Sequence, residues 1–183
     1  MKRPDILPAD SYVDIEKLPR LVELIRELVD SVDLTPYTID VVQNEEGLSL
    51  GWRNVIIMPY QNANDNYYIE YPELTEASKE VVKYASTMSG VDRIAINILP
   101  PANIVPLHYD NADNSDDGII PPHYNLLVPL DNNGHSIVNE KLIKNEYGVP
   151  LIFDPQSYHG AFNSTFETRI NFFAKVTNES FHY

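Results

Sequence analysis

The chain has 183 residues, of which 43% are hydrophobic, so it is long enough to form one domain with a substantial core. Acidic residues outnumber basic ones by 27 to 13, and the formal net charge of −14 disfavours a nucleic-acid backbone or an anionic membrane as the main partner. There is no cysteine, which excludes disulfides and thiolate metal sites. We therefore expect a single domain over residues 1–183 whose partner is a small molecule or a peptide, with an oligomeric state that the sequence does not indicate.

The first residues, Met1 to Pro8, lack the apolar stretch of a secretion signal, and no apolar run is long enough to cross a bilayer. We expect a cytoplasmic protein.

Two amphipathic helices are predicted in the first half of the chain. Apolar residues recur at intervals of three and four from about Pro19 to Val32, and again from about Pro72 to Ser89, where Gly90 supplies a natural stop. Proline is acceptable in the first turn of each helix. The spacing predicts a helical N-terminal part over about residues 1–90.

The remaining apolar runs are short and separated by clusters of Pro, Gly, Asn and Asp, a pattern that is typical of a β-sandwich or barrel. This pattern predicts a β core over about residues 91–177 and a mainly β fold with N-terminal helices. The expected strands are Trp52 to Met58, Arg93 to Leu99, Ile104 to Tyr109, Tyr124 to Leu130, Val149 to Phe153 and Arg169 to Val176.

Three residues in the C-terminal half have the chemistry of a metal site. His108 and Asp110 stand two apart in an expected strand, so their side chains point to the same side and Tyr109 points away. His159 is expected to come from a later strand on the facing side of the same cavity. Two imidazoles and one carboxylate are the ligands that hold non-haem iron(II) on one face and leave the other face open.

Arg169 lies ten positions after His159. A hairpin across residues 160–168 could return the chain so that this arginine points into the same cavity. A guanidinium pairs with a carboxylate through two hydrogen bonds, which suits the distal end of a dicarboxylate such as 2-oxoglutarate. Zinc accepts the same three ligands, but nothing else in the sequence supplies a hydrolytic mechanism.

Three segments around these residues resemble the 2-oxoglutarate and iron(II)-dependent oxygenases, and most closely the aspartyl/asparaginyl β-hydroxylase-like family. The segments are Asn97 to His108, Pro122 to Leu130, and Glu146 to Asp154 leading to His159. The resemblance covers roughly residues 93–176. It implies a double-stranded β-helix, which is the jelly-roll or cupin architecture, and it agrees with the pattern of short strands.

The resemblance also implies roles for single residues. His108 and His159 match the family's iron ligands, and Arg169 matches the arginine that binds the distal carboxylate of 2-oxoglutarate. His123 matches a histidine near the other end of the cosubstrate, and Asn97 stands where the family can place a small polar contact to it.

The sequence departs from the family pattern at two positions. Asp110 completes a ligand triad, whereas the mammalian member has a glycine at this position and lacks the carboxylate. A complete triad argues against halogenation, which needs an open position for halide. Pro121 stands where the family often has an arginine, so no guanidinium is expected to contact cosubstrate or substrate from this position.

Other polar residues have competing interpretations. Arg53 could hold a substrate carboxylate, but an ordinary ion pair explains it as well. The acidic stretch Asp113 to Gly118 resembles half of a calcium-binding loop but has Tyr124 where a glutamate is required, so we interpret it as a loop that could cover the active site. His135 in an expected turn and His182 near the end of the chain receive no role.

These observations predict an Fe(II)- and 2-oxoglutarate-dependent dioxygenase, with His108, Asp110 and His159 as ligands. It would use O2 to hydroxylate an unactivated C–H bond of an amino acid or peptide side chain, with succinate and CO2 as co-products. The substrate class follows from the family resemblance alone. The alternative is a metal-binding cupin without redox turnover, acting as a small-molecule binding or structural protein.

Overall fold

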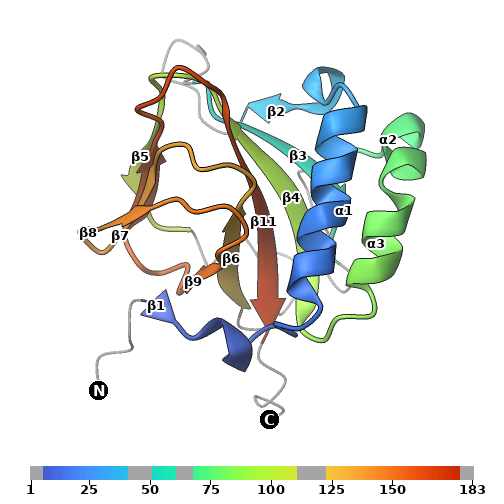
Figure 1. Ribbon diagram of the computed structural model, residues 1–183, viewed down its shortest axis with the longest axis horizontal. Helices are drawn as coiled ribbons and strands as arrows, with labels where there is room; N and C mark the ends of the chain where they lie inside the picture. Colours follow the sequence, from blue (N-terminus) through green and yellow to red (C-terminus); the bar gives the residue numbers. More distant parts are fainter. Residues whose placement is uncertain (1–5, 41–50, 61–67, 111–122, 178–183) are drawn as a thin grey trace.

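The computed structural model describes residues 6–40, 51–60, 68–110 and 123–177. Its strands form two antiparallel sheets, one of seven strands and one of four, with three helices packed on the outer face of the larger sheet (Figure 1). The fold is a mainly β jelly roll, as the sequence predicts.

The first part of the described chain contains the helices and three strands. Before the helices lies β1 (Ile6–Leu7), which is followed by a short 3-10 turn, Ala9–Ser11. A second 3-10 turn, Thr35–Tyr37, follows the first helix. The other elements here are α1 (Leu18–Ser31), β2 (Ile39–Asp40), β3 (Arg53–Met58), α2 (Pro72–Ala77) and α3 (Lys79–Ala85).

Eight further strands form the jelly roll itself. They are β4 (Val91–Leu99), β5 (Ile104–His108), β6 (His123–Pro129), β7 (His135–Val138), β8 (Lys141–Lys144), β9 (Leu151–Phe153), β10 (His159–Phe162) and β11 (Arg169–Thr177).

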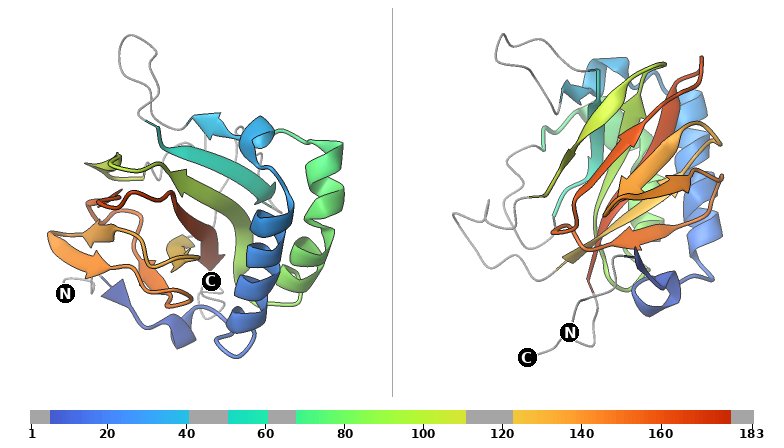
Figure 2. Two further views of the ribbon diagram at one scale, coloured as in Figure 1. Left: turned by 45° about the horizontal axis from the view of Figure 1, so that its top comes forward. Right: turned by 90° about the vertical axis from the view of Figure 1, so that its left-hand side faces the viewer.

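Along the chain these strands alternate between the two sheets, except that β7 and β8 form a hairpin within the smaller sheet. β4, β6, β9 and β11 lie in the larger sheet, whose order is β1-β9-β6-β11-β4-β3-β2, and β5, β7, β8 and β10 form the smaller sheet in the order β5-β10-β7-β8. The two sheets face each other, which the left view of Figure 2 shows. This alternation is the winding of a double-stranded β-helix, which confirms the fold predicted from the family resemblance.

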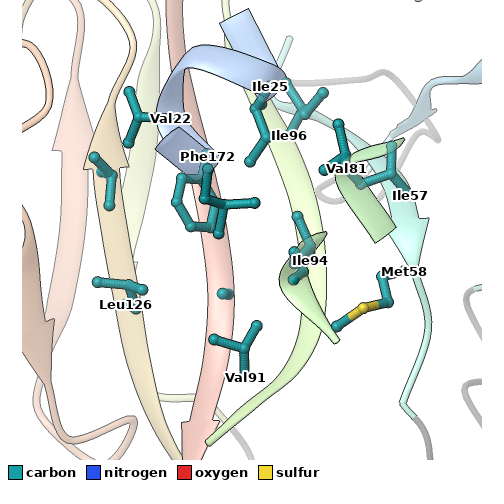
Figure 3. Packing of buried hydrophobic residues seen from close by; sticks show 14 of the residues in the cluster. Val22, Ile25, Ile57, Met58, Val81, Val91, Ile94, Ile96, Leu126 and Phe172 are labelled. Carbon is teal, nitrogen blue, oxygen red and sulfur yellow. The ribbon is translucent and has the colours of Figure 1, made fainter. Parts of the chain in front are cut away.

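The two faces of the larger sheet differ in chemistry because side chains alternate along a strand. On β11, Phe172, Ala174 and Val176 are fully buried and belong to the hydrophobic core with α1 and α3. Figure 3 shows this core, with Val22 and Ile25 of α1 packed over Phe172 and Ile96. The opposite face, which lines the interior of the barrel, carries Arg169 and Lys175. Polar groups therefore gather inside the barrel, and the apolar core lies outside it.

The predicted helices are present with one difference. The helix expected from Pro72 to Ser89 is divided into α2 and α3 at Ser78, and α3 ends at Ala85. Ser78 is buried and has φ −86° and ψ 0°, which departs from helical geometry. Gly90 has φ +81°, and a Cβ there would lie 2.6 Å from the carbonyl oxygen of Thr177, so only glycine fits this turn.

The N-terminal part is less purely helical than predicted. Besides the helices it supplies β1, β2 and β3, which extend the larger sheet at both edges. β7 and β8 lie in a part of the chain to which the sequence analysis assigned no strand. None of the described helices is long and apolar enough to span a membrane.

Candidate active site

The three expected metal ligands lie together at one end of the smaller sheet. His108 ends β5 and pairs directly with His159, the first residue of β10. Asp110 follows two residues after His108, and its Oδ1 lies 3.5 Å from Nε2 of each histidine. The ligand atoms of all three residues lie within 4.8 Å of one another, which is compact enough for one metal ion.

The strand that carries His159 is not where the sequence interpretation put it. We expected it on the facing side of the cavity, but β10 is the neighbour of β5 within the smaller sheet. Two histidines paired across adjacent antiparallel strands project to the same side, so the predicted convergence is achieved by strand pairing. Tyr109 is exposed and its ring contacts that of Tyr158, which confirms that it points away.

Each imidazole is held in one orientation by a backbone carbonyl two residues earlier. Nδ1 of His108 lies 2.7 Å from the Pro106 oxygen, and Nδ1 of His159 lies 2.7 Å from the Ser157 oxygen. A carbonyl only accepts hydrogen bonds, so Nδ1 carries the proton in both rings and the lone pair is left on Nε2. This is the tautomer that a metal ligand needs, and the bond to the other ring nitrogen is the usual support of a metal-binding histidine.

The two oxygens of the Asp110 carboxylate have different partners. Its Oδ1 faces the two histidines, whereas Oδ2 accepts hydrogen bonds from Lys175 Nζ at 2.9 Å and Asn125 Nδ2 at 2.8 Å. Burial alone would raise the pKa of Asp110, but His108, His159 and Lys175 outweigh it and hold the pKa far below its usual range. Asp110 is therefore ionised and ready to bind a cation.

Charge also affects the partners of Asp110. Burial lowers the pKa of His108, but the hydrogen bonds to Asp110 and to the Pro106 carbonyl outweigh burial and leave the pKa raised. The pKa of Lys175 is lowered because burial outweighs the attraction of Asp110.

The donor set fits a divalent metal. Two imidazole nitrogens with free lone pairs and one ionised carboxylate oxygen converge on one point, as non-haem iron(II) requires. The side chains of His108 and Asp110 are 30% and 27% exposed, so one side of the centre is accessible.

Arg169 begins β11 and its side chain is enclosed between the two sheets, with 1% of the residue exposed. Its Nη1 donates to the His135 carbonyl at 2.8 Å and its Nη2 to Ser136 Oγ at 2.9 Å. The Asn145 oxygen lies 3.3 Å from Nη2, and the Asn171 amide, turned so that its oxygen faces the guanidinium, accepts from Nε and Nη2 at 3.1 Å each. The guanidinium is thus fixed by neutral acceptors.

Within the described part of the chain, no carboxylate forms an ion pair with Arg169. Burial lowers its pKa to about 10, and only the more distant charge of Asp131 opposes this effect. A buried cation held by neutral groups is costly unless an anion comes to it. Ser136 pairs with Ala161, which lies two residues after His159, so the guanidinium contacts the sheet about 7 Å along the strand from the metal ligands.

The route by which the chain reaches Arg169 also differs from the prediction. β10 and β11 lie in different sheets, so residues 163–168 form a crossing between sheets and not a hairpin. The buried amide of Asn163 holds this crossing through hydrogen bonds to the carbonyls of Leu99, Pro100 and Glu167.

Asn97 and His123 both lie on strands of the larger sheet. Asn97 is paired with Asn171 of β11 and donates to Asn54 Oδ1 at 2.5 Å, while its own Oδ1 is buried and without a partner among the described residues. Asn97 therefore lies beside Asn171, whose amide binds the Arg169 guanidinium. His123 begins β6, on the same face as Asn125, and its ring lies 6.3 Å from that of Tyr60.

Arg53 does not join the site. It pairs in register with Ile98, a residue packed against the outer core, and its Nε lies 3.5 Å from Asp40 Oδ1. The two side chains are 42% and 37% exposed and contact each other, so the structure favours the ion-pair interpretation.

Some sequence features have other outcomes. His135 is the first residue of β7, so the expected turn is wrong there, and its ring stacks on Phe162. The acidic stretch Asp113 to Gly118, Pro121 and His182 lie outside the described residues.

Sequence reasoning missed several residues that complete the site. Because side chains alternate between the two faces of a strand, Lys175 lies on the same face of β11 as Arg169. For the same reason, Asn125 lies on the same face of β6 as His123. Among the described residues, interior side chains that the sequence analysis did not single out include Asn125, Ser136, Asn145, Asn171 and Lys175.

The interior of the barrel carries charge of the opposite sign to the whole chain. Arg93, Arg169 and Lys175 are all buried on strands of the larger sheet, although the net charge of the protein is −14. Asp110 lies against Lys175, and it is itself an expected metal ligand. The arrangement suits a metal ion together with an anionic ligand.

Comparison with known structures supports the fold. A crystal structure of an oxidoreductase of the 2OG-Fe(II) oxygenase family from Burkholderia pseudomallei aligns over 95% of this chain and 84% of that chain, with 14% identity and a TM-score of 0.53. A predicted oxalate decarboxylase from Thermotoga maritima aligns over 68% and 79% of the two chains with 14% identity and a TM-score of 0.41. At this identity the first likeness shows the fold alone.

A search of curated proteins with the sequence found no match. The family model of aspartyl/asparaginyl beta-hydroxylase matches residues 16–179, which is most of the chain and includes all four residues of the candidate site. The chain therefore belongs to the aspartyl/asparaginyl beta-hydroxylase family.

Proposed function

We propose that the protein is an iron(II)- and 2-oxoglutarate-dependent dioxygenase that hydroxylates an unactivated C–H bond. One observation carries the proposal: three ligand atoms converge with the correct tautomers, and a buried arginine without an ion-pair partner among the described residues lies beside them. Neither a metal site nor a buried arginine alone would indicate this reaction.

His108, Asp110 and His159 would hold the metal. When bound, iron(II) supplies the activation of O2, coupled to oxidative decarboxylation of 2-oxoglutarate to succinate and CO2. The protein keeps the imidazole lone pairs directed at the metal through the Pro106 and Ser157 carbonyls. Three protein ligands leave positions for a bidentate 2-oxo acid and for O2.

Arg169 would anchor the distal carboxylate of 2-oxoglutarate. Its guanidinium is already oriented by Ser136, Asn145 and the His135 carbonyl, so little conformational freedom is lost when the anion binds. Asn97 offers an amide oxygen that has no hydrogen-bond partner in the described parts of the chain, and we assign it and His123 supporting contacts to the cosubstrate.

The carboxylate of Asp110 favours hydroxylation over halogenation, because it occupies the position that a halide would need. For the substrate we propose an amino acid, either free or as a side chain within a peptide. Its support is the family to which the chain belongs, whose name describes hydroxylation of aspartyl and asparaginyl residues.

The proposal is tested by incubating the purified protein with iron(II), O2 and 2-oxoglutarate and a panel of amino acids and peptides. Succinate should form in amounts that match the hydroxylated product, and chelation of iron or removal of O2 should abolish both. If the protein binds metal but forms no succinate with any member of the panel, the alternative of a metal-binding cupin without redox turnover replaces this proposal. Activity that persists without O2 would indicate a zinc hydrolase.

A further inference from the structure

Asp110 lies beyond the end of β5, so strand pairing does not fix its conformation. It follows the last residue of β5 by two positions, and its backbone is held by a hydrogen bond from its N–H to the Pro155 carbonyl and by one from the Gln156 side chain to its own carbonyl. The two histidines, by contrast, belong to paired strands. The direction of the Asp110 carboxylate therefore depends on what its side chain contacts.

Those contacts come from the larger sheet on the other side of the barrel. Lys175 of β11 and Asn125 of β6 pair in register, and the Lys175 ammonium donates to the Asn125 oxygen at 2.6 Å. Both then donate to Oδ2 of Asp110. Lys175 and Asn125 are 7% and 0% exposed, so solvent does not compete for these hydrogen bonds.

We propose that Lys175 and Asn125 are positioning residues of the metal centre, which hold Oδ2 of Asp110 so that the carboxylate presents only Oδ1 to the metal. This inference rests on the proposed metal site. A carboxylate free to rotate would offer the metal either oxygen or both, whereas two buried donors on Oδ2 select one. The larger sheet would thus fix a ligand that the smaller sheet presents.

The contact between Lys175 and Asp110 also has an effect that would weaken metal binding. An ammonium group close to a divalent cation repels it, so charge alone would make the metal bind more weakly in the presence of Lys175. Holding the Asp110 carboxylate in one orientation should instead make the metal bind more tightly. The direction in which metal affinity changes when Lys175 is replaced therefore decides between the two effects.

The test is the dissociation constant of the metal alone, measured anaerobically with iron(II) and separately with cobalt(II), for wild type and Lys175→Met. Methionine keeps much of the length and the apolar stem but removes the charge and the donors. Loss of such an outer partner typically weakens metal binding by roughly 10- to 100-fold, and we expect that range here. The visible spectrum of bound cobalt(II) should also change, which a loss of stability alone would not produce.

Arg93→Met is the matched control. Arg93 pairs with Lys175 across β4 and β11 and is also a buried cation, but its guanidinium lies over the Tyr60 ring. Removing it should leave metal affinity within about threefold of wild type, because the donors to Oδ2 of Asp110 are Lys175 and Asn125, whereas the Arg93 guanidinium lies against Tyr60. Equal weakening in both variants would mean that neither acts by positioning Asp110, and this would overturn the proposal.

Asn125→Ala provides an independent variant if Lys175→Met does not fold. It removes one donor to Oδ2 and should weaken metal binding in the same direction. In the double variant with Lys175→Met, the further loss of metal affinity caused by Asn125→Ala should be smaller than the loss that Asn125→Ala causes alone. The reason is that both residues donate to the same oxygen. Unchanged or tighter metal binding in the folded single variants contradicts the inference, whereas a wild type that binds no metal contradicts the proposed function instead.

Discussion

At the scale of single residues, the site depends on how buried polar groups are satisfied. The two histidines are directed by backbone carbonyls, and Asp110 is directed by side chains from another sheet. His108, Asp110, His159 and Arg169 could be identified from the sequence because their chemistry is distinctive and their spacing is that of strands. Ser136 and Asn145 could not, because a serine or an asparagine in a strand or turn has no such signature until its partner is known.

Arg169→Ala should raise the 2-oxoglutarate concentration needed for half-saturation at least tenfold while metal affinity stays within about threefold. The reason is that hydrogen bonds to a charged group contribute roughly 1.5–3 kcal/mol each, and this arginine does not contact the metal ligands. Isothermal titration with each ligand separates the two effects. Arg53→Ala, which removes a partly exposed arginine paired with Asp40, is the control and should change neither affinity. A large loss of metal binding in Arg169→Ala would show that its role is misassigned.

At the scale of elements, the longer patterns predict the observed helices and strands, except that the helix expected from Pro72 to Ser89 is divided into α2 and α3. α1 has its predicted apolar stripe, and β4, β6 and β11 lie within two residues of the predicted ranges at each end. β7 and β8 have four residues each and stand next to turns rich in Asn and Gly, so their apolar content is too small to show alternation. Sequence alone also could not show that β5 and β10 pair, because pairing between distant strands leaves no local pattern.

Phe172 of β11 tests the outer core. It is fully buried against α1, and its replacement by alanine should cost about 3–5 kcal/mol in the free energy of unfolding. Chemical denaturation measures this. Phe166→Ala should change it by less than about 0.5 kcal/mol, since that side chain is fully exposed, and a comparable loss in both variants would show that the core is misplaced.

Gly134 tests the turn beneath Arg169. It has φ +70°, and a Cβ there would meet the backbone of Phe162 and Asn163 and the Cδ of Arg169. We expect Gly134→Ala to destabilise the protein by about 1 kcal/mol or more and to weaken 2-oxoglutarate binding, because the arginine must move. Gly148→Ala is the comparison: it shares a positive φ but has open space, so it should lose stability without losing cosubstrate affinity.

At the scale of the whole molecule, the two faces of the larger sheet have different roles, since one forms the apolar core and the other lines the interior with the candidate site. The helices cover the outer face of the larger sheet (Figure 2) and form an apolar core with it, whereas the interior contains the charged and amide groups. The overall acidity of the chain gives no hint of this, because composition averages over the cationic interior. The jelly roll itself could be predicted because many short strands and the family resemblance indicate the same architecture.

Metal binding should stabilise the whole fold, because a ligand that binds only the folded state adds about 2.7 kcal/mol at a concentration 100 times its dissociation constant. Thermal unfolding with and without iron(II) under anaerobic conditions should show a higher midpoint with metal. His159→Ala should abolish this increase. An equal increase in that variant would place the metal elsewhere.

The central claim is that the triad and Arg169 form one site for iron and 2-oxoglutarate, and anaerobic visible spectroscopy tests it most directly. Adding both iron(II) and 2-oxoglutarate to the wild type should produce the weak charge-transfer band of the chelate, which neither gives alone. The band should be absent in His159→Ala and should require a higher 2-oxoglutarate concentration in Arg169→Ala. A wild type that binds iron but shows no band, or a band that is unaffected in both variants, would contradict the account.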